Sequence, residues 1–390
     1  MPRMSANTRA PRSSLVFWLP VAAIGWAGFV LIAAQLASLD PSRLGDDLRL
    51  LVDAGNRWRD GVPLYAAPAG TALEAESLFY SYPPLVAQAM ALVAGIPFPA
   101  IFAAWTAGAV GGLWLVAERL GRDGRAVAWP ALALAPYVYP LAVALLLGNL
   151  NAWFPVAFGL VLAAAVAGGR AVPVAGGAAL AIASLAKLHP ASLGLWLLVR
   201  GLREGRAGRS YRVLAVAAVV GLGLLAAGVA LGGVGPWADY VAFLRGGAGT
   251  ADLVSPLNVG PASQLAQLLG LSDATARGLQ AGVSVIALAG TAAAARLLVD
   301  PVESFGWATV ASLVILPVTW FHYPVALLPV ALAAASRARG EARRRTILLL
   351  GAAIVTAALA ILAPVLVWAA AAVVLAAARA SRTAAAETHP

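Results

Sequence analysis

The sequence has few charged residues and no cysteine. Asp, Glu, Lys and Arg make up only 11% of its 390 residues, and 61% are hydrophobic, whereas about 25% of residues are charged in an average soluble domain. This shortage of charge excludes a soluble globular fold. The lack of cysteine excludes disulfide bonds and thiolate metal sites. The sequence also lacks a P-loop and a His-Glu-x-x-His motif, which argues against ATP-driven transport and zinc proteolysis.

The charged residues that are present give a formal net charge of +10. The arginines form short clusters between apolar runs, whereas nucleic-acid-binding proteins gather them on one continuous face. Nucleic acid is therefore not an expected partner. By the positive-inside rule, three clusters indicate cytoplasmic loops: Arg3, Arg9 and Arg12; Arg200, Arg203, Arg206, Arg209 and Arg212; and Arg337, Arg339, Arg343, Arg344 and Arg345.

Apolar runs of about 20 residues, the length of a transmembrane helix, recur from Leu15 almost to the C-terminus. They predict an all-α polytopic membrane protein with about twelve transmembrane helices. The spans are expected near 15–37, 82–97, 99–118, 126–147, 149–169, 172–199, 213–233, 280–298, 305–319, 323–336, 346–363 and 365–379. The first apolar run is too long for a cleavable signal peptide.

This topology predicts a single transmembrane domain over residues 15–379, with cytoplasmic tails at 1–14 and 380–390. Two outer loops, 38–81 and 235–280, are long enough to carry structure, so we expect the chemistry on the outer side.

Within the first outer loop, Leu50–Arg59 is expected to form an amphipathic helix on the membrane surface, ended by Gly61 and Pro63. One cluster, Arg119, Arg122 and Arg125, falls on the outer side against the positive-inside rule. The region 82–118 therefore holds either two spans or one span plus a half-helix.

Ionisable groups inside or beside a bilayer are costly and often line a substrate path. Asp46 and Asp47 follow the first span, and a carboxylate there can act as a general base. The alternative is a solvated loop charge, or an N-cap for a helix that begins at Leu48.

Lys187 is the only lysine of the chain and interrupts an apolar stretch, with His189 and Pro190 close behind. A lysine ammonium group is a good partner for phosphate. The alternative is that its side chain reaches toward the membrane interface.

His322 lies between aromatic residues, in Trp320-Phe321-His322-Tyr323, at the expected outer end of a span. Its imidazole can donate a hydrogen bond to phosphate or move a proton. The alternative is a hydrogen-bonded histidine within an interfacial aromatic belt.

Two further segments carry polar side chains between apolar runs. Tyr80 and Tyr82 precede two prolines and fit an interfacial helix start. Asn149 and Asn151 place two amides between spans, where the alternative to a site role is hydrogen bonding between helices.

Taken together, these segments resemble glycosyltransferase family 87, the polyprenyl-phosphate-mannose-dependent mannosyltransferases of the glycosyltransferase C superfamily. The family pattern runs from an Asp through Gly and Leu-Tyr to Tyr-x-Tyr-Pro-Pro, and then through Gly-Gln-x-Asn, Lys-x-x-Pro and Trp-x-His-Tyr. The corresponding elements occur in this order at Asp47–Tyr65 (with Gly61 and Leu64), Tyr80–Pro84, Gly148–Asn151, Lys187–Pro190 and Trp320–Tyr323. Two departures are Leu50 and Leu51, where aromatic residues are common, and Asn149, where glutamine is usual.

The resemblance implies a glycosyltransferase C-type helical bundle that transfers a mannosyl residue, with inversion, from a polyprenyl-phosphate donor to a hydroxyl of a glycolipid or lipid-linked glycan. It implies Asp47 as the general base, with Asp46 as the alternative, and Lys187 and His322 as ligands of the donor phosphate. No metal or other cofactor is expected. The expected substrate pocket comprises Asp46, Arg57, Tyr65, Tyr80, Tyr82, Asn149, Asn151, His189, Asn258, Trp320 and Tyr323.

The expected location is the plasma membrane, with the active site on the extracytoplasmic side. Two alternatives stay open. A lipid or glycolipid flippase would use Lys187 and His322 to bind an anionic headgroup and would tolerate substitution of Asp47. An enzyme of the same fold could use another polyprenyl-phosphate sugar, such as arabinofuranose.

Overall fold

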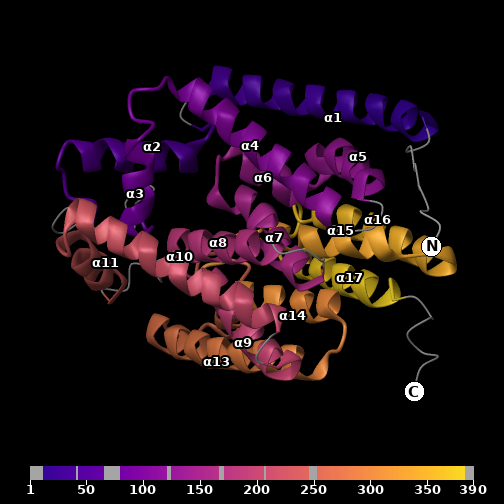
Figure 1. The fold of residues 1–390 in the computed structure, drawn as a ribbon. Helices are drawn as coiled ribbons and strands as arrows, with labels where there is room; N and C mark the ends of the chain where they lie inside the picture. The colour runs from indigo at the N-terminus through magenta and orange to yellow at the C-terminus, as the bar shows by residue number, and fades with distance from the viewer. Residues whose placement is uncertain are drawn as a thin grey trace.

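A computed structural model describes residues 12–40, 43–65, 80–120, 124–166, 171–205, 208–245 and 253–382 (Figure 1). Arg3, Arg9, Arg122 and Arg206 lie outside the described residues, as do parts of both tails and of both expected outer loops. All regular structure in these ranges is helical, with no strand. The predicted all-α class is confirmed, and the apolar helices make the chain a membrane protein.

The helices follow one another along the whole described chain. The α-helices are α1 (Arg12–Leu39), α2 (Asp46–Arg59), α3 (Pro84–Ala91), α4 (Phe98–Arg119), α5 (Gly124–Leu134), α6 (Tyr139–Leu146), α7 (Phe154–Val166), α8 (Ala171–Ala186), α9 (Ser192–Glu204), α10 (Arg209–Gly232), α11 (Gly235–Arg245), α12 (Pro261–Leu269), α13 (Asp273–Leu297), α14 (Pro301–Val314), α15 (Leu328–Arg337), α16 (Gly340–Leu359) and α17 (Leu366–Ala380). Short 3-10 helices are η1 (Ala135–Tyr137), η2 (Leu150–Trp153), η3 (His189–Ala191) and η5 (Tyr323–Leu327).

Four described helices are long and apolar enough to cross a membrane: Phe17–Leu39 of α1, α4, α10 and α13. A fifth candidate is the pair Ala126–Tyr137 and Tyr139–Leu146, which is bent by 69°. These coincide with the spans expected near 15–37, 99–118, 213–233, 280–298 and 126–147. The total of twelve spans is not confirmed and stays a prediction.

Two further predicted spans differ from a continuous membrane-spanning helix. The segment near 82–97 forms α3, whose eight residues extend about 12 Å, compared with a hydrocarbon core of about 30 Å. The region 82–118 thus contains one long helix and one short one, as in the half-helix alternative. The expected span 172–199 is broken between Ala186 and Ser192, where Pro190 cannot continue a helix because it lacks an N–H group.

The main core lies among α4, α7, α8, α9, α14, α15 and α17, and its largest fully buried side chains include Trp196, Phe158 and Phe305. Helices α7 and α8 occupy the middle of the bundle, between α1 and α13 (Figure 1). A smaller core joins α2 and α3 to α4 through Leu48, Leu51 and Ala54. This second core fixes the position of α2.

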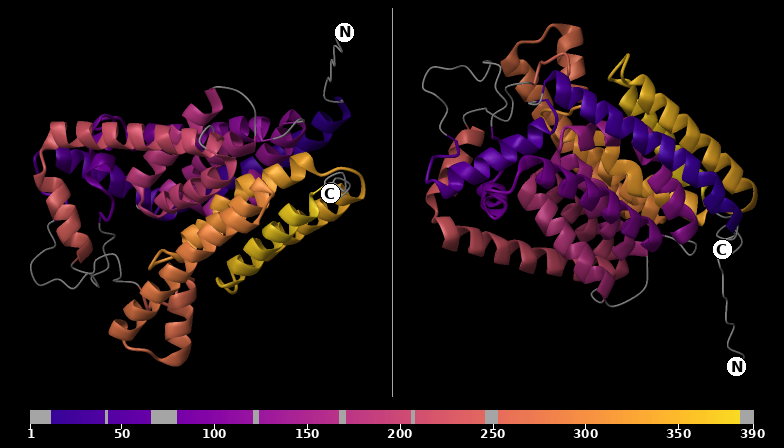
Figure 2. Two further views of the ribbon diagram at one scale, coloured as in Figure 1. Left: turned by 60° about the horizontal axis from the view of Figure 1, so that its bottom comes forward. Right: turned by 90° about the horizontal axis from the view of Figure 1, so that it is seen from above.

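The amphipathic helix expected over Leu50–Arg59 is present as α2 and ends just before Gly61. Its buried residues recur on one side, because Leu48, Leu51 and Ala54 lie three apart along the helix. Helices α2, α3 and α11 gather at one end of the bundle (Figure 1). Helices α16 and α17 form an antiparallel pair along one side (Figure 2).

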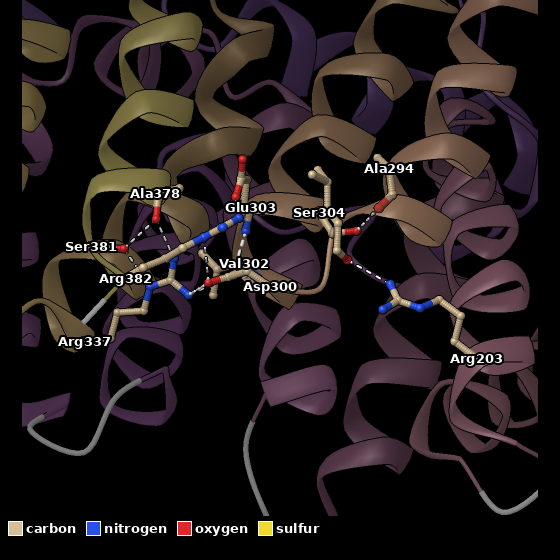
Figure 3. A network of polar contacts seen from close by, with 11 residues as sticks. Arg203, Ala294, Asp300, Val302, Glu303, Ser304, Arg337, Ala378, Ser381 and Arg382 are labelled. Carbon is tan, nitrogen blue, oxygen red and sulfur yellow. Dashed lines mark hydrogen bonds and ion pairs between the residues drawn. The ribbon is translucent and has the colours of Figure 1, made fainter. Parts of the chain in front are cut away.

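At the opposite end of the bundle, Asp300 joins three helices (Figure 3). Its Oδ1 accepts hydrogen bonds from the backbone N–H groups of Val302 at 2.7 Å and Glu303 at 3.0 Å, which caps α14. Arg337, in the last turn of α15, donates to both carboxylate oxygens at 2.9 and 2.7 Å. The Arg337 guanidinium also donates to Ser381 Oγ beyond α17 at 2.7 Å.

This ion network corrects part of the loop prediction for 337–345. Arg337 is a half-buried member of a salt bridge, and Arg382 pairs with Glu303 beside it. Arg343 to Arg345 lie in α16. The sequence does carry a signal for the start of α14. Asp300-Pro301-Val302-Glu303 has the acidic cap, first-turn proline and third-position glutamate of a helix start.

Candidate active site

The end of α6 meets the start of α2. The backbone N–H of Gly45 donates to the carbonyl of Leu146 at 2.9 Å, and that of Asp47 donates to the carbonyl of Leu147 at 3.0 Å. These bonds satisfy N–H groups at the start of α2 that have no partner within their own helix. Neither Asp46 nor Asp47 is the N-cap of α2, because that position belongs to Gly45.

Gly148 allows the turn after α6 to lie directly against α2. Its φ of +64° is in the left-handed region, which favours glycine. A Cβ atom at this position would lie 2.5 Å from the Cβ of Leu48, too close for a real contact. The absence of a side chain at Gly148 therefore sets the position of the following residue, Asn149.

Two buried asparagines connect this turn to Asp47. Asn149 Nδ2 donates to Asp47 Oδ2 at 2.7 Å. Asn149 Oδ1 accepts from the backbone N–H of Asn151 at 2.8 Å and from Asn151 Nδ2 at 2.6 Å. Only 3% of Asn149 is exposed, and none of Asn151. The asparagine pair does join helices, but through the carboxylate of Asp47.

Lys187 approaches the same place from the end of α8. Its Nζ donates to the hydroxyl of Tyr323 at 2.7 Å and lies 6.0 Å from the ring centroid of Tyr82. Asp47 is near enough to interact electrostatically with Lys187, Tyr82 and Tyr323. The Lys187 side chain therefore points to partners within the protein, in contrast to the interfacial alternative.

Asp47 is a largely buried carboxyl group at the centre of these contacts. Burial raises the pKa of Asp47 above its ordinary value, and the neighbouring carboxylate of Asp46 adds to the increase. The hydrogen bond from Asn149 and the positive charge of Lys187 lower the pKa, with a smaller effect than burial. Asp47 is thus a stronger proton acceptor than an exposed aspartate and remains held by defined partners.

Two histidines lie near Lys187, and both are buried, with 4% of each residue exposed. The ring of His322 packs edge-on against Tyr323, with centroids 4.9 Å apart. The ring of His189 packs against Phe154 at 5.1 Å. Among the described residues, no ring nitrogen of either histidine has a hydrogen-bond partner. His322 therefore has unused hydrogen-bonding groups beside Tyr323, whereas His189 faces an aromatic side of the core.

Asp46 has different neighbours from Asp47. The charges that act on it most strongly after burial are those of Asp40, Arg43 and Arg49. Burial raises the pKa of Asp46, and Arg43 and Arg49 oppose the increase. The two aspartates thus belong to separate groups of side chains, and the amides contact Asp47.

Three other residues of the expected pocket form hydrogen bonds in the segments around Tyr82. The hydroxyl of Tyr65 donates to the carbonyl of Tyr82 at 2.6 Å. The hydroxyl of Tyr80 donates to the carbonyl of Pro83 at 2.7 Å and fixes the start of α3. Arg57 donates to the carbonyl of Leu64 at 3.2 Å. These bonds hold the segment that presents Tyr82.

Asn258 and Trp320 contact parts of the chain other than the asparagine pair. The Asn258 side chain donates to the carbonyls of Leu253 and Pro317 and accepts from the N–H groups of Gly260 and Thr319. It therefore links the late loop to the segment before Trp320. Trp320 is half-buried and packs against the main core, and its carbonyl accepts from the N–H of Tyr323.

The sequence does not predict that the carbonyl groups of Leu146 and Leu147 hold the start of α2. Every residue has a backbone carbonyl, so residue type does not indicate which carbonyls accept these bonds. They are identified only by the structure, in which the end of α6 contacts the start of α2. Within the described residues, no three His, Asp or Glu side chains gather in a way that could hold a metal ion.

Two apolar cavities occur in the described part of the chain. One, of about 190 Å³, is lined by apolar side chains of α5, η1, α6, η5, α15, α16 and α17. The other, of about 500 Å³, lies between α1 and α4. Neither is lined by Asp47, Lys187 or His322. The candidate site is therefore defined by its polar contacts rather than by the larger apolar hollows.

Residues 80–320 match the model of glycosyltransferase family 87. This range contains Tyr82, Asn149 and Lys187, and it ends just before His322. No curated protein matches the chain.

Proposed function

The chain belongs to glycosyltransferase family 87 and is a membrane glycosyltransferase, and we propose that its donor is a polyprenyl-phosphate mannose. The acceptor in this proposal is a hydroxyl group of a glycolipid or lipid-linked glycan. Transfer takes place at the outer face of the plasma membrane, within a single domain over residues 15–379 that has both tails in the cytoplasm. The observation that carries the proposal is the grouping of Asp47 and Lys187, 140 positions apart in the sequence, around Tyr323.

In the proposed reaction, the acceptor oxygen attacks the anomeric carbon of mannose while the bond from that carbon to the phosphate oxygen breaks. Asp47 takes the proton of the acceptor hydroxyl. The lipid phosphate leaves with the bonding electron pair. Attack from the side opposite to the leaving group inverts the anomeric configuration. The raised pKa of Asp47 favours this role, because a more basic carboxylate accepts the proton more readily.

Lys187 and His322 are proposed to bind the departing phosphate. Charge grows on that group as the bond breaks, so a cation or hydrogen-bond donor placed there stabilises the transition state. Tyr323 accepts a hydrogen bond from Lys187 and thereby holds the ammonium group on the side of Asp47. The rings of Tyr82 and Tyr323 are proposed to line the space for the sugar.

Substitution of the two aspartates tests the assignment of the base. Asp47→Asn is expected to lower transfer roughly a thousandfold, within the range of general-base catalysis. Asp46→Asn is the matched control and is expected to retain most activity, because the charges that act on Asp46 are those of Asp40, Arg43 and Arg49. Purified protein would be incubated with polyprenyl-phosphate mannose and a panel of glycolipids, with products identified by mass spectrometry. Near-normal transfer by the Asp47→Asn protein would exclude this base.

The identity of the donor sugar is tested in the same assay. Polyprenyl-phosphate arabinofuranose would be supplied in parallel, and the proposal expects a product from the mannose donor. A product from the arabinofuranose donor alone would reject mannose while leaving the role of Asp47 intact. Movement of lipid across vesicles without a new glycosidic bond would reject the proposed reaction.

A further inference from the structure

A directional chain of hydrogen bonds runs from Asn151 through Asn149 to Asp47. The backbone N–H of Asn151 is a donor only, so the atom of Asn149 that it meets at 2.8 Å must be the carbonyl oxygen, Oδ1. The NH₂ group of Asn149 is then the atom that faces Asp47 Oδ2 at 2.7 Å. The orientation of the Asn149 amide is therefore fixed by the backbone of η2.

An amide NH₂ group donates and does not accept, so it pairs best with a carboxylate that carries its negative charge. It engages Oδ2 of Asp47 and leaves Oδ1 to receive a proton from the acceptor hydroxyl. The amide also resists rotation of the carboxylate, because Asn149 is itself held twice by Asn151. Both asparagines are buried, so water does not compete for these bonds.

We propose that Asn149 is a positioning residue for the general base, and that Asn151 holds Asn149 in the orientation that this role requires. The inference rests on the proposed function of Asp47 and deepens it. Neither asparagine is assigned contact with the reacting atoms. They act by fixing which oxygen of Asp47 faces the acceptor and by keeping the carboxylate charged.

Four other titratable groups lie around Asp47. Asp46 lies beside it on α2, Lys187 approaches from the end of α8, and Tyr82 and Tyr323 approach from the start of α3 and from η5. These groups are unchanged in an Asn149 variant. A change in the titration of activity after substitution of Asn149 therefore reports the lost amide.

The test is the pH dependence of kcat/KM for Asn149→Ala. The base works in its deprotonated form, so activity falls as the pH drops through the pKa of Asp47. Loss of a donor that favours the charged form raises that pKa. The acidic limb of the pH profile, where kcat/KM falls on acidification, is expected to move up by about one pH unit. The plateau of kcat/KM at higher pH is expected to fall roughly tenfold to a hundredfold, because the carboxylate of Asp47 is misoriented. Asn151→Ala is expected to move the limb in the same direction by a smaller amount.

Two further variants separate positioning from folding. Asn149→Gln keeps an NH₂ donor and is expected to leave the acidic limb near its wild-type position even if the plateau falls. Gln88→Ala is the matched control for loss of a buried amide: Gln88 Nε2 donates to the carbonyl of Gly228 at 2.8 Å and links α3 to α10. We expect Gln88→Ala to lower thermal stability without moving the limb.

An acidic limb that stays in place in Asn149→Ala, or that moves equally in Gln88→Ala, would overturn the positioning role. Asp47→Asn is measured alongside them. If Asp47→Asn remains active, the proposed base itself is wrong. If Asp47→Asn is inactive while the limb of Asn149→Ala does not move, the base stands and only the role of Asn149 is rejected.

Discussion

At the scale of single residues, the candidate site depends on Lys187 ending an apolar helix with its ammonium group directed at Tyr323. The same cation lowers the pKa of Asp47 and opposes the effect of burial. Lys187 thus has two proposed effects, on the phosphate of the donor and on the charge of the base. A single substitution should show both effects in separate measurements, because the first changes donor binding and the second changes the pH profile of activity.

Replacement of Lys187 by Met keeps an unbranched apolar chain and removes the charge. We expect the KM for the donor to rise and kcat to fall, each roughly tenfold or more, because the departing phosphate loses a cationic partner. The acidic limb of kcat/KM should also move to higher pH, since the positive charge that lowers the pKa of Asp47 is gone. Steady-state kinetics over a range of pH measure both effects. Unchanged donor KM and kcat would contradict the role of Lys187 at the phosphate.

The wild-type protein should itself show the influence of burial on Asp47. Burial raises the pKa of this carboxyl group, and the base is active only when deprotonated. Activity is therefore expected to be lost on acidification at a higher pH than for an ordinary aspartate, and to be retained above that pH. A pH profile of kcat/KM with a saturating acceptor measures this. An acidic limb at or below the ordinary aspartate value would argue against a buried base.

The sequence predicts Asp47, Lys187 and His322 as site residues because charged and ionisable groups are scarce in this chain. It does not reveal which of two adjacent aspartates meets the amides. That distinction depends on the direction in which α2 begins, and this is set by the carbonyls of Leu146 and Leu147. Asn258 illustrates the converse case: a polar residue in an apolar chain whose four hydrogen bonds make it a structural link.

At the scale of helices, the candidate site lies where the ends of several helices meet. The start of α2 receives the end of α6, and the break between α8 and α9 presents Lys187 to η5. Helix ends leave backbone groups without partners, so they are suited to hold polar side chains in an otherwise apolar protein. Gly148 is the residue on which the α6–α2 junction depends most, since a Cβ atom at this position would collide with Leu48.

Gly148→Ala tests this junction. The new Cβ would meet Leu48 and should displace Asn149 from Asp47, with a large loss of transfer. Gly61→Ala is the matched control, because Gly61 has a φ of +70° but open space around a Cβ atom. Gly61→Ala is expected to lower the free energy of unfolding by about 1 kcal/mol, because alanine disfavours a left-handed backbone. Gly148→Ala is expected to lower it by roughly 2 kcal/mol more, because the new Cβ overpacks the junction. Thermal unfolding in detergent measures the stability of both variants, and transfer assays measure their activity. Equal losses of stability and activity in Gly148→Ala and Gly61→Ala would contradict the role of Gly148.

Several helices could be predicted from the sequence and others could not. The apolar face of α2 repeats at helical spacing, so the helix is evident before Gly61. The region 172–199 is apolar nearly throughout, and hydropathy alone merges α8 and α9 into one span. The break depends on Pro190 and on the partners of Lys187, which come from a segment far along the chain. Hydropathy likewise does not reveal that α3 stops after eight residues.

At the scale of the whole molecule, polar contacts lie at both ends of the bundle. The Asp300 network ties α14, α15 and the end of α17 together at the end away from α2 (Figures 1 and 3). Its salt bridge is largely buried, with 15% of the Asp300 side chain and 25% of the Arg337 side chain exposed. Removing one partner of such a pair leaves an uncompensated charge. The network should therefore support stability without taking part in transfer.

Asp300→Ala is expected to lower the free energy of unfolding by about 3 kcal/mol through loss of the ion pair and the helix cap. The folded protein should keep its KM for the donor. Glu341→Ala is the matched control, because the Glu341–Arg345 pair is mostly exposed and pairs of that kind contribute little. Thermal unfolding of both variants measures the difference. A stable Asp300→Ala protein with an altered donor KM would show that this end of the bundle acts on the site.

The most direct test of the central claim measures donor binding and sugar transfer in the same sample. Wild-type and Asp47→Asn proteins in lipid nanodiscs would be titrated with polyprenyl-phosphate mannose, and acceptor would then be added for a single turnover. We predict equal donor affinity for the two proteins, with one released polyprenyl phosphate for each new glycosidic bond in the wild type and no product from Asp47→Asn. Transfer by the Asp47→Asn protein at the wild-type rate would contradict the account.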